Sequence, residues 1–143
     1  MTETHRQRYE ISSDPARLDA ARIHTWLSTD TYWARGRTRE HHDAAIAGSL
    51  NFGAYDLASG EQAGYARVVT DLATFAWLCD VYVDPAARGN GLGGGLVAAA
   101  RDHLAPTGVR RFLLATADAH GVYEKAGFQP LDHPDRWMSL RFA

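Results

Sequence analysis

Cysteine and lysine are almost absent from this 143-residue chain, and no long hydrophobic run occurs in it. The single cysteine, Cys79, can form no disulfide within the chain and excludes a zinc site built on several cysteines. A lone thiol suits a reducing compartment, so the sequence predicts a cytoplasmic protein. Without a run of about 18 apolar residues, the chain is not expected to cross a membrane. The polar segment Met1–Arg6 lacks the apolar stretch of a signal peptide.

An excess of charge of either sign is also missing, because the formal net charge at pH 7 is −2. This balance argues against a general nucleic-acid-binding protein. The histidines do not share the spacing of a metal site, so no bound metal is expected. What the chain does contain is apolar sequence. With 45% hydrophobic and 22% charged residues it can bury a core, and its length predicts one domain spanning residues 1–143.

The hydrophobic periodicity predicts an α/β or α+β fold with a central sheet. The expected helices run from Asp14-Pro15 to about Thr29, from Thr38 to about Gly48, from the end of a glycine-rich loop to about Leu104, and over Asp118–Ala126. The expected strands are Tyr9–Ser12, Leu50–Asp56, Gln62–Thr70, Thr74–Val83, Arg110–Thr116, Phe128–Leu131 and Trp137–Phe142. Thr74–Val83 is mostly apolar and is expected to lie at the centre of the sheet.

A glycine-rich loop, Arg88–Gly93, follows this central strand and opens a helix. Glycines let successive backbone N–H groups converge, and a helix N-terminus adds partial positive charge. Together these features suit a phosphate or pyrophosphate group, although an ordinary strand-to-helix turn can also be rich in glycine. A P-loop is excluded because no lysine follows the glycines. Gly89-x-Gly91-x-x-Gly94 matches the dinucleotide fingerprint, but only about 50 residues follow it, too few for a dinucleotide-binding domain.

Two sequence blocks resemble the signature of the GNAT (N-acetyltransferase) superfamily. Arg88-x-x-Gly91-x-Gly93 after Val83-Asp84-Pro85 resembles its acetyl-CoA motif, and Tyr123–Phe128, Tyr-Glu-Lys-Ala-Gly-Phe, resembles its Tyr-Glu-Lys-x-Gly-Phe block. One helix and one strand separate the two blocks, as that fold requires. The resemblance implies a mixed central sheet with about four flanking helices and with strands splayed at the acetyl-CoA site. The segments Tyr32–Arg37 and Thr74–Leu78 look like a branch of small GNAT proteins.

The resemblance also implies which residues bind acetyl-CoA as co-substrate. Backbone N–H groups of the loop would hold the pyrophosphate, namely those of Arg88, Gly89, Asn90, Gly91, Leu92 and Gly93. The backbone of Val81, Tyr82 and Val83 would pair with the pantetheine arm. Thr116 replaces the family's usual asparagine, and Ala119 matches a small residue that lets the cofactor lie close. Arg110–Thr116 should diverge from the central strand to leave room for the thioester.

Two side chains are candidates for the chemistry of acyl transfer. Tyr123 occupies the position of the family's tyrosine, whose hydroxyl reaches the sulfur of CoA; otherwise it packs its helix on the sheet. Asp80 lies where some GNAT enzymes carry an acid, and it would orient or deprotonate the amine. By strand alternation it shares a face with Leu78 and Tyr82. The alternative is a structural carboxylate bonded to the backbone or to arginine. Trp77 replaces a glutamate base found in other members.

The acceptor is less well defined by the sequence. Tyr32, Trp33 and Arg35 lie in a loop that rims the acceptor pocket in this fold, although they can equally pack at the surface. Trp77 is a weaker candidate, and Arg67 with Asp71 is expected to form a hairpin salt bridge.

These features together predict an acetyl-CoA-dependent N-acetyltransferase that acts on a small-molecule amine, with a homodimer as one candidate assembly. Two alternatives stay open: acetylation of a protein N-terminus or lysine, and an acyl-CoA-binding sensor without turnover.

Overall fold

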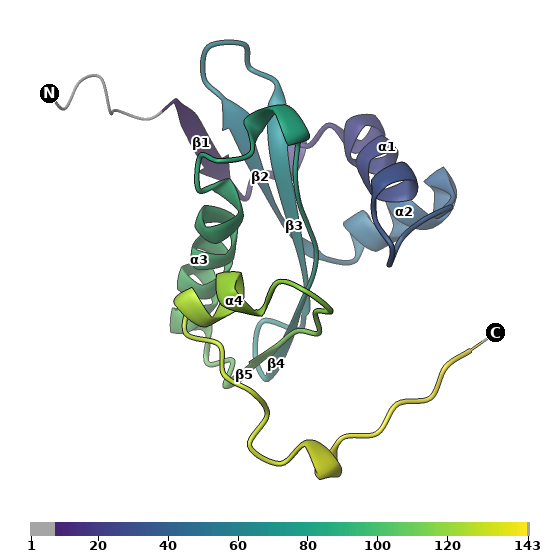
Figure 1. The fold of residues 1–143 in the computed structure, drawn as a ribbon, viewed down its shortest axis with the longest axis vertical. Coiled ribbons are helices and arrows are strands. Elements are labelled where there is room, and N and C mark those ends of the chain that lie inside the picture. Colours follow the sequence, from purple (N-terminus) through teal and green to yellow (C-terminus); the bar gives the residue numbers. More distant parts are fainter. Residues whose placement is uncertain (1–7, 143) are drawn as a thin grey trace, which may run out of the picture.

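The computed structural model describes residues 8–142, so the polar N-terminal segment lies outside the described residues. Five strands form one sheet in the order β1-β2-β3-β4-β5 (Figure 1). They are β1 (Tyr9–Ser12), β2 (Leu50–Asp56), β3 (Gln62–Thr70), β4 (Phe75–Val83) and β5 (Arg111–Leu113). The first four pair antiparallel and β5 pairs parallel to β4. The mixed central sheet expected from the sequence is therefore confirmed.

Helices lie on both faces of this sheet: α1 (Ala20–Asp30), α2 (Arg39–Ala47), α3 (Leu92–Leu104) and the short α4 (His120–Lys125). Thr38 caps α2 as expected, because its hydroxyl accepts a hydrogen bond from the His41 amide. The first helix begins later than expected. Asp14 and Pro15 start only a 3-10 turn, and α1 begins at Ala20 because the Asp19 carboxylate caps it by accepting from the Arg22 amide. No helix within residues 8–142 is long and apolar enough to span a membrane.

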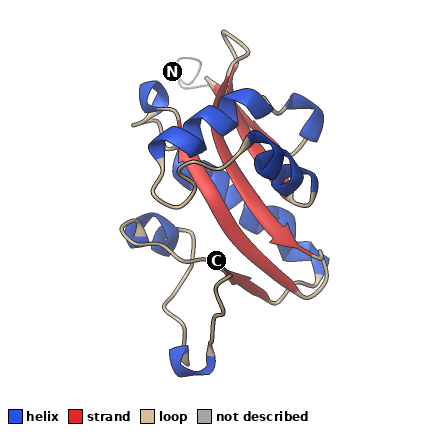
Figure 2. Ribbon diagram, turned by 90° about the vertical axis from the view of Figure 1, so that its right-hand side faces the viewer, coloured by secondary structure: helices blue, strands red, loops and turns tan. Residues whose placement is uncertain are grey.

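Two hydrophobic clusters hold the helices to the sheet. On one face, Leu96 and Val97 of α3 pack against β2, β3 and β4. On the other face, Ile23 and Trp26 of α1 pack against Tyr82 and its neighbours. Figure 2 shows α1 and α2 crossing in front of the sheet, with α3 behind it. The sheet is therefore the middle layer of three, and its two faces present different side chains.

A β-bulge in β4 decides which face each of its residues occupies. Tyr65 pairs with Tyr82 but Arg67 pairs with Cys79, so β4 has one extra residue between these pairs. Asp80 lies in this bulge with a positive φ of 53°, which is unusual for a residue other than glycine. Leu78 consequently joins the α3 cluster whereas Tyr82 joins the α1 cluster. The expectation that these two share a face with Asp80 is wrong for Leu78, because strict alternation breaks at the bulge.

The strands β4 and β5 separate soon after they meet. Their pairing covers three residues of β4 and ends where Trp77 lies opposite Leu113. Beyond this point β4 continues to Val83 without β5 beside it. The expected strand Arg110–Thr116 is thus shortened to Arg111–Leu113. The divergence predicted for the acyl site is present in the backbone.

The two expected C-terminal strands, Phe128–Leu131 and Trp137–Phe142, are not formed among the described residues. The ring of Phe128 instead packs against Phe112 at a centroid distance of 5.1 Å. Pro130 and Pro134 lack the N–H group that a strand ladder needs, which interrupts pairing along this segment. The chain beyond Arg136 runs away from the body of the molecule (Figure 1). The predictions of strands at Phe128–Leu131 and Trp137–Phe142 were therefore wrong.

His42 couples the packing of α2 to pH. Its side chain is 1% exposed and its ring lies 5.3 Å from that of His24. Burial lowers the pKa of His42, with the nearby His24 and Arg37 acting in the same direction, while Asp43 and the Ala20 backbone oppose the shift. The folded protein therefore binds fewer protons at this site than the unfolded chain does. Acid consequently favours the unfolded chain once pH falls below about 6.5, the ordinary pKa of histidine.

We expect the free energy of unfolding of the wild type to fall more steeply between pH 7.5 and pH 5 than that of His42→Leu, which cannot titrate. Urea denaturation at several pH values measures this difference. The neighbouring His41 is exposed, so His41→Leu is the matched control and should keep the wild-type slope. Identical slopes in the wild type and His42→Leu would show that His42 does not carry the acid sensitivity.

Candidate acyl-transfer site

The glycine-rich loop has the backbone geometry of an anion-binding turn. Gly89 and Gly91 have positive φ values of 87° and 74°, and Gly91 caps the N-terminus of α3. A Cβ at either glycine would meet no atom within 4 Å. The positive φ angle, rather than a lack of space, is therefore what favours glycine at these two positions. The amide of Gly95 makes the first hydrogen bond of the helix, to the Gly91 carbonyl. The N–H groups at the start of α3 have no helical partner and can bind an anion.

Two side chains of this loop hold its shape. The Arg88 Nε donates to the Val83 carbonyl at 3.0 Å, and its guanidinium lies over the Tyr82 ring. The Asn90 amide nitrogen donates to the Ala87 carbonyl at 2.8 Å. The backbone N–H of Arg88 points to the Pro85 carbonyl at 3.4 Å, so it is already engaged within the turn. The other five predicted donors, on Gly89, Asn90, Gly91, Leu92 and Gly93, are better placed for a ligand.

The end of β4 leads directly into this loop. Val81 and Val83 pack toward the α3 cluster. Tyr82 packs on Trp26 on the opposite face, and its hydroxyl donates to the Asp30 carboxylate. Burial and this hydrogen bond raise the pKa of Tyr82 to about 12. One backbone edge of this segment pairs with β3, while the other has no strand beside it. That free edge offers hydrogen-bond donors and acceptors to an extended ligand.

Tyr123 lies across the gap from β4, on α4. It is half-buried, and its ring contacts that of Phe128 at 6.1 Å. Burial raises the pKa of Tyr123, and the neighbouring Tyr32 and Asp118 act in the same direction. The phenol therefore keeps its proton at neutral pH and can donate it. Thr116 lies just before the helix, where its hydroxyl accepts from the Ala119 amide at 3.1 Å, so its first function is to shape this turn.

The loop between α1 and α2 bridges the two sides of the gap. The Tyr32 hydroxyl accepts from the Ala117 amide at 3.2 Å, beyond β5. Trp33, in edge contact with Tyr32, donates from its Nε1 to Asp80 in β4 at 2.8 Å. Both aromatic rings are more than 40% exposed, at 62% and 44%. The Arg35 guanidinium instead donates to the Thr29 carbonyl near the end of α1, at 3.3 Å.

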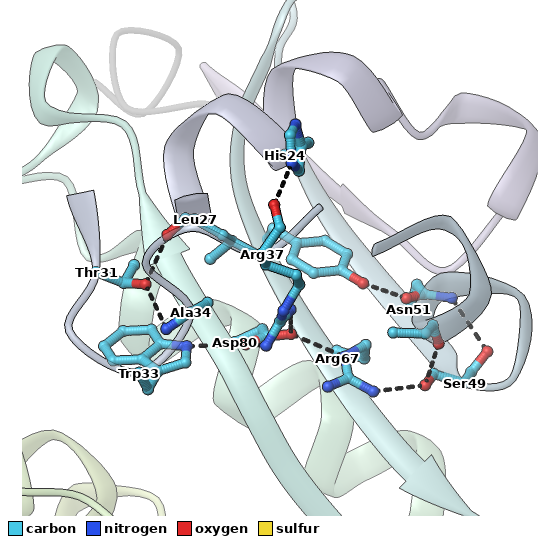
Figure 3. Close-up of polar contacts among 12 residues, drawn as sticks. His24, Leu27, Thr31, Trp33, Ala34, Arg37, Ser49, Asn51, Arg67 and Asp80 are labelled. Carbon is cyan, nitrogen blue, oxygen red and sulfur yellow. Dashed lines mark hydrogen bonds and ion pairs between the residues drawn. The ribbon is translucent and has the colours of Figure 1, made fainter. Parts of the chain in front are cut away.

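Asp80 is the centre of a buried ionic cluster (Figure 3). Its carboxylate accepts hydrogen bonds of 2.8 Å each from Trp33, Arg37 and Arg67. The residue is 4% exposed. Burial alone would raise the pKa of Asp80, but the hydrogen bond from Arg37 and the charge of Arg67 outweigh it and lower the pKa overall. A carboxylate that holds its charge this firmly is a weak proton acceptor.

Sequence reasoning offered arginine as an alternative partner of Asp80 but did not identify Arg37, Arg67 or Trp33 as its partners. The expected salt bridge between Arg67 and Asp71 is wrong, because Asp71 instead accepts from the Thr74 amide and hydroxyl at 2.7 Å each. Arg67 reaches Asp80 because it lies on the neighbouring strand beside the bulge. Arg37 comes from a loop 43 residues away in sequence. Only the spacing of aromatic and arginine residues in that loop pointed toward the site.

Trp77 lies at the last pair between β4 and β5, where the strands begin to part, and it is 36% exposed. A cavity of about 760 Å³ is lined by β5 and by parts of the chain that follow it, including Thr116 and Tyr123. Among residues 8–142 no group of three or more metal-ligating side chains is close enough to hold a metal ion. The structure thus provides a candidate anion-binding loop at the start of α3, an edge of β4 that β5 does not cover beyond Trp77, and a protonated phenol on α4.

Comparison with known proteins agrees with this arrangement. The profile of the acetyltransferase (GNAT) family matches residues 20–128. A candidate acetyltransferase of Gibberella zeae is 30% identical over 135 residues, which cover 82% of this chain and 76% of that protein. The crystal structure of a candidate GNAT-family acetyltransferase from Xanthomonas campestris matches this chain with a TM-score of 0.88. The two sequences are 41% identical, and the match covers 95% of this chain and 94% of that one.

More distant structures share the fold. Glucosamine-6-phosphate N-acetyltransferase from Arabidopsis thaliana is 22% identical with a TM-score of 0.69, over 96% of this chain and 100% of that one. A GNAT-family acetyltransferase from Brucella melitensis, solved with acetyl-CoA, is 23% identical with a TM-score of 0.69, over 85% of this chain and 83% of that one. The family profile and the close structural relative carry the assignment: this chain belongs to the GNAT family of acetyltransferases.

Proposed function

We propose that this acetyltransferase transfers the acetyl group of acetyl-CoA to a primary amine of a small molecule, by direct attack of the amine on the thioester. The observation that carries the proposal is the early separation of β4 from β5, with the Arg88–Gly93 loop after the end of β4 and with Tyr123 on α4, near Tyr32 of the bridging loop. The half-buried Cys79, without a partner thiol, suits a reducing compartment such as the cytoplasm.

Binding of acetyl-CoA would use the backbone more than side chains. The N–H groups from Gly89 to Gly93 would hold the pyrophosphate, because two positive φ angles turn this loop toward an anion. The free edge of Val81–Val83 would pair with the amide groups of the pantetheine arm. Ala119, which has only a methyl side chain, would leave room for that arm beside α4. Thr116 would contribute chiefly by capping the same turn.

The reaction requires a neutral amine and a leaving thiolate. As the amine nitrogen forms its bond to the carbonyl carbon, the carbon–sulfur bond breaks and the sulfur leaves with its electron pair. Tyr123 would donate its phenolic proton, or a hydrogen bond, to that sulfur. The pKa of Tyr123 is raised, so the phenol keeps its proton at neutral pH and is better suited to donating a hydrogen bond to the sulfur than to transferring the proton fully.

Asp80 would act by orienting the loop that carries Trp33 and Arg37. Its three hydrogen bonds and its lowered pKa make it a poor acceptor for the proton of the amine. By holding Trp33 and Arg37, it instead fixes the loop that approaches the gap from the α1 side. The proton would then leave the amine through water. Asp80 is thus proposed as a positioning residue for the acceptor side of the site.

Aromatic side chains dominate the acceptor side. Tyr32 and Trp33 are exposed on the bridging loop, and Trp77 is partly exposed where β4 and β5 part. This surface suits a compact amine with an apolar or planar body. Arg35 would contribute less, because its guanidinium is bonded to the end of α1. The Arabidopsis neighbour acts on glucosamine 6-phosphate, which shows that this fold can take a small amine.

Replacing Gly91 tests the pyrophosphate loop. Gly91→Asp places a carboxylate where an anion is expected, so the affinity for CoA should fall at least about tenfold, or about 1.4 kcal/mol. Gly91→Asn is the matched control, because asparagine has the same shape and tolerates positive φ without the charge. Its affinity should lie between those of the wild type and Gly91→Asp. Isothermal titration calorimetry measures both. Wild-type affinity in a folded Gly91→Asp protein would contradict the assignment.

Turnover of a panel of amines tests the activity itself. Thiol release and product mass should show acetylation of small primary amines, with little transfer to peptides. Tyr123→Phe should lower kcat by roughly 10–100-fold, while the Kd for acetyl-CoA stays close to the wild-type value because the ring remains. Undiminished kcat in this variant would reduce Tyr123 to a packing residue. Transfer only to peptides would favour protein acetylation, and binding without turnover would favour a sensor.

Asp80→Asn tests the positioning role. We expect kcat/KM for the amine to fall roughly 10–1000-fold with little change in acetyl-CoA affinity, because the substitution loosens the acceptor side only. The wild-type pH profile is the second readout. The pKa of Asp80 lies below its usual value, so its ionisation should produce no activity limb above about pH 5. A limb between pH 5 and 8 that disappears in Asp80→Asn would make Asp80 the base after all.

A further inference from the structure

The ionic cluster around Asp80 holds more positive than negative charge. Arg37 and Arg67 both form salt bridges of 2.8 Å with its single carboxylate. Among residues 8–142, no second carboxylate lies within salt-bridge distance of either guanidinium. Cys79, opposite Arg67 in the sheet, adds no negative charge, because burial raises the pKa of its thiol to about 11. Two guanidinium groups and one carboxylate therefore leave one net positive charge.

Both guanidinium groups keep hydrogen-bond donors that a ligand can use. Arg67 donates from Nε to Asp80 and from Nη1 to the Ser49 hydroxyl at 3.1 Å, whereas its Nη2 has no acceptor within residues 8–142. Arg37 spends its two terminal nitrogens on Asp80, and its Nε has no acceptor in the same part of the chain. Neither nitrogen is sealed from solvent, since the two side chains stay 15% and 14% exposed. A guanidinium with unused N–H groups is suited to bind a carboxylate.

This positive charge lies on the face of the sheet that carries the exposed aromatic side chains. The residues on either side of Arg67 and of Trp77 pack into the α3 cluster, so these two side chains lie on the opposite face. Trp33 reaches the same place from the bridging loop and donates to Asp80 (Figure 3). The unused guanidinium donors are thus next to the surface proposed above for the acceptor.

The cluster also lies where the acetyl group would arrive, a step that rests on the proposed function. With the pyrophosphate at the glycine-rich loop, the pantetheine arm would run back along β4 from Val83 to Val81. The next residue in that direction is Asp80. The attacking amine must meet the acetyl group there, so the rest of the acceptor comes within reach of the two arginines. A net positive charge at this point attracts an anionic group of the acceptor.

We propose that the acceptor is an amine that carries a carboxylate, and that Arg37 and Arg67 bind this carboxylate. One net positive charge is matched by one carboxylate, and the Arg67 Nη2 and Arg37 Nε would donate to its two oxygens. Trp33 and Trp77 would contact the apolar part of the molecule. Asp80 holds the two arginines in place for this contact. The acceptor class is thereby narrowed from small amines to amino carboxylates with an apolar or aromatic body, of which an amino acid is the simplest.

Matched acceptors test the carboxylate. L-phenylalanine and L-leucine are compared with 2-phenylethylamine and 3-methylbutylamine, which lack only the carboxylate. In the wild type, kcat/KM for each amino acid should exceed that of its amine at least about tenfold, because hydrogen bonds between charged groups are among the strong ones. Arg67→Met should remove most of this preference, chiefly by raising KM for the amino acid. Equal kcat/KM within both pairs in the wild type would overturn the proposal.

Arg39→Met is the matched control. Arg39 is an exposed arginine of α2 that pairs with Asp43 and not with Asp80, so its loss should leave the preference for amino acids intact. Arg67→Lys keeps the positive charge but not the planar guanidinium, and it should retain part of the preference. The affinity of Arg67→Met for acetyl-CoA should stay close to that of the wild type. A loss of acetyl-CoA affinity as large as the loss for the amino acid would assign the arginine to the co-substrate and overturn the proposal.

Calorimetry separates this inference from the proposed activity. L-phenylalanine is titrated into protein saturated with CoA, where no transfer takes place, and should bind more tightly to the wild type than to Arg67→Met. The phosphonate analogue of phenylalanine should bind more weakly than the amino acid; tighter binding would assign the site to a phosphate group and overturn the carboxylate. Acetyl transfer to amines without any preference for a carboxylate would refute this inference alone. Binding of the amino acid that depends on Arg67, without transfer, would refute the proposed activity alone.

Discussion

The buried carboxylate of Asp80 is the interaction on which the acceptor side of this molecule depends. It ties a strand, a neighbouring strand and a loop together through Arg67, Arg37 and Trp33. Two partly buried guanidinium groups share one buried carboxylate, so losing the carboxylate would leave two partly buried cations without this partner. Breaking a buried pair of this kind typically costs about 3–5 kcal/mol. The positive φ at Asp80 is strain that this cluster can hold in place.

The same bulge arranges the acyl side of the site. One extra residue in β4 moves Tyr82 to the α1 face, where its hydroxyl reaches Asp30. Val81 and Val83 remain on the α3 face, beside the helix that begins at the glycine loop. The last stretch of β4 is therefore anchored through side chains on both faces, while its free backbone edge turns toward the gap. A ligand can add to that edge without disturbing the packing.

The opening between β4 and β5 follows from the shortness of their pairing. Three residues of ladder hold the strands together at one end, and within residues 8–142 no strand pairing joins them at the other. Tyr32 spans the opening by accepting from the Ala117 amide, so the loop that carries Trp33 also limits how far the strands part. The outer edge of β5 is left open by the same short strand. The gap proposed to hold acetyl-CoA thus begins where this three-residue pairing ends.

Much of the fold could be predicted from the sequence because local rules operate strongly in those places. β2, β3 and most of β4 follow apolar patterns, and Thr38 caps α2 through its own hydroxyl. The glycine loop and the Tyr123–Phe128 block carried the family resemblance, since both depend on residue types at fixed spacing. The places of Gly91 at a helix start and of Tyr123 beside the gap agree with that expectation. Whether they bind and react as proposed stays a prediction.

The sequence by itself determined the order of the elements as far as α4, the glycine-rich turn at the start of α3 and the apolar alternation of residues 137–142. Only the tertiary structure decided the partners of Asp80, the break in alternation at the bulge and the lack of strand pairing along residues 137–142. Arg37 and Asp80 are 43 residues apart, and no local preference specifies such a contact. A bulge arises from the register between two strands, which neither strand encodes alone. Residues 137–142 alternate like a strand, but a strand forms only where another strand pairs with it, and none of the described strands pairs with this segment.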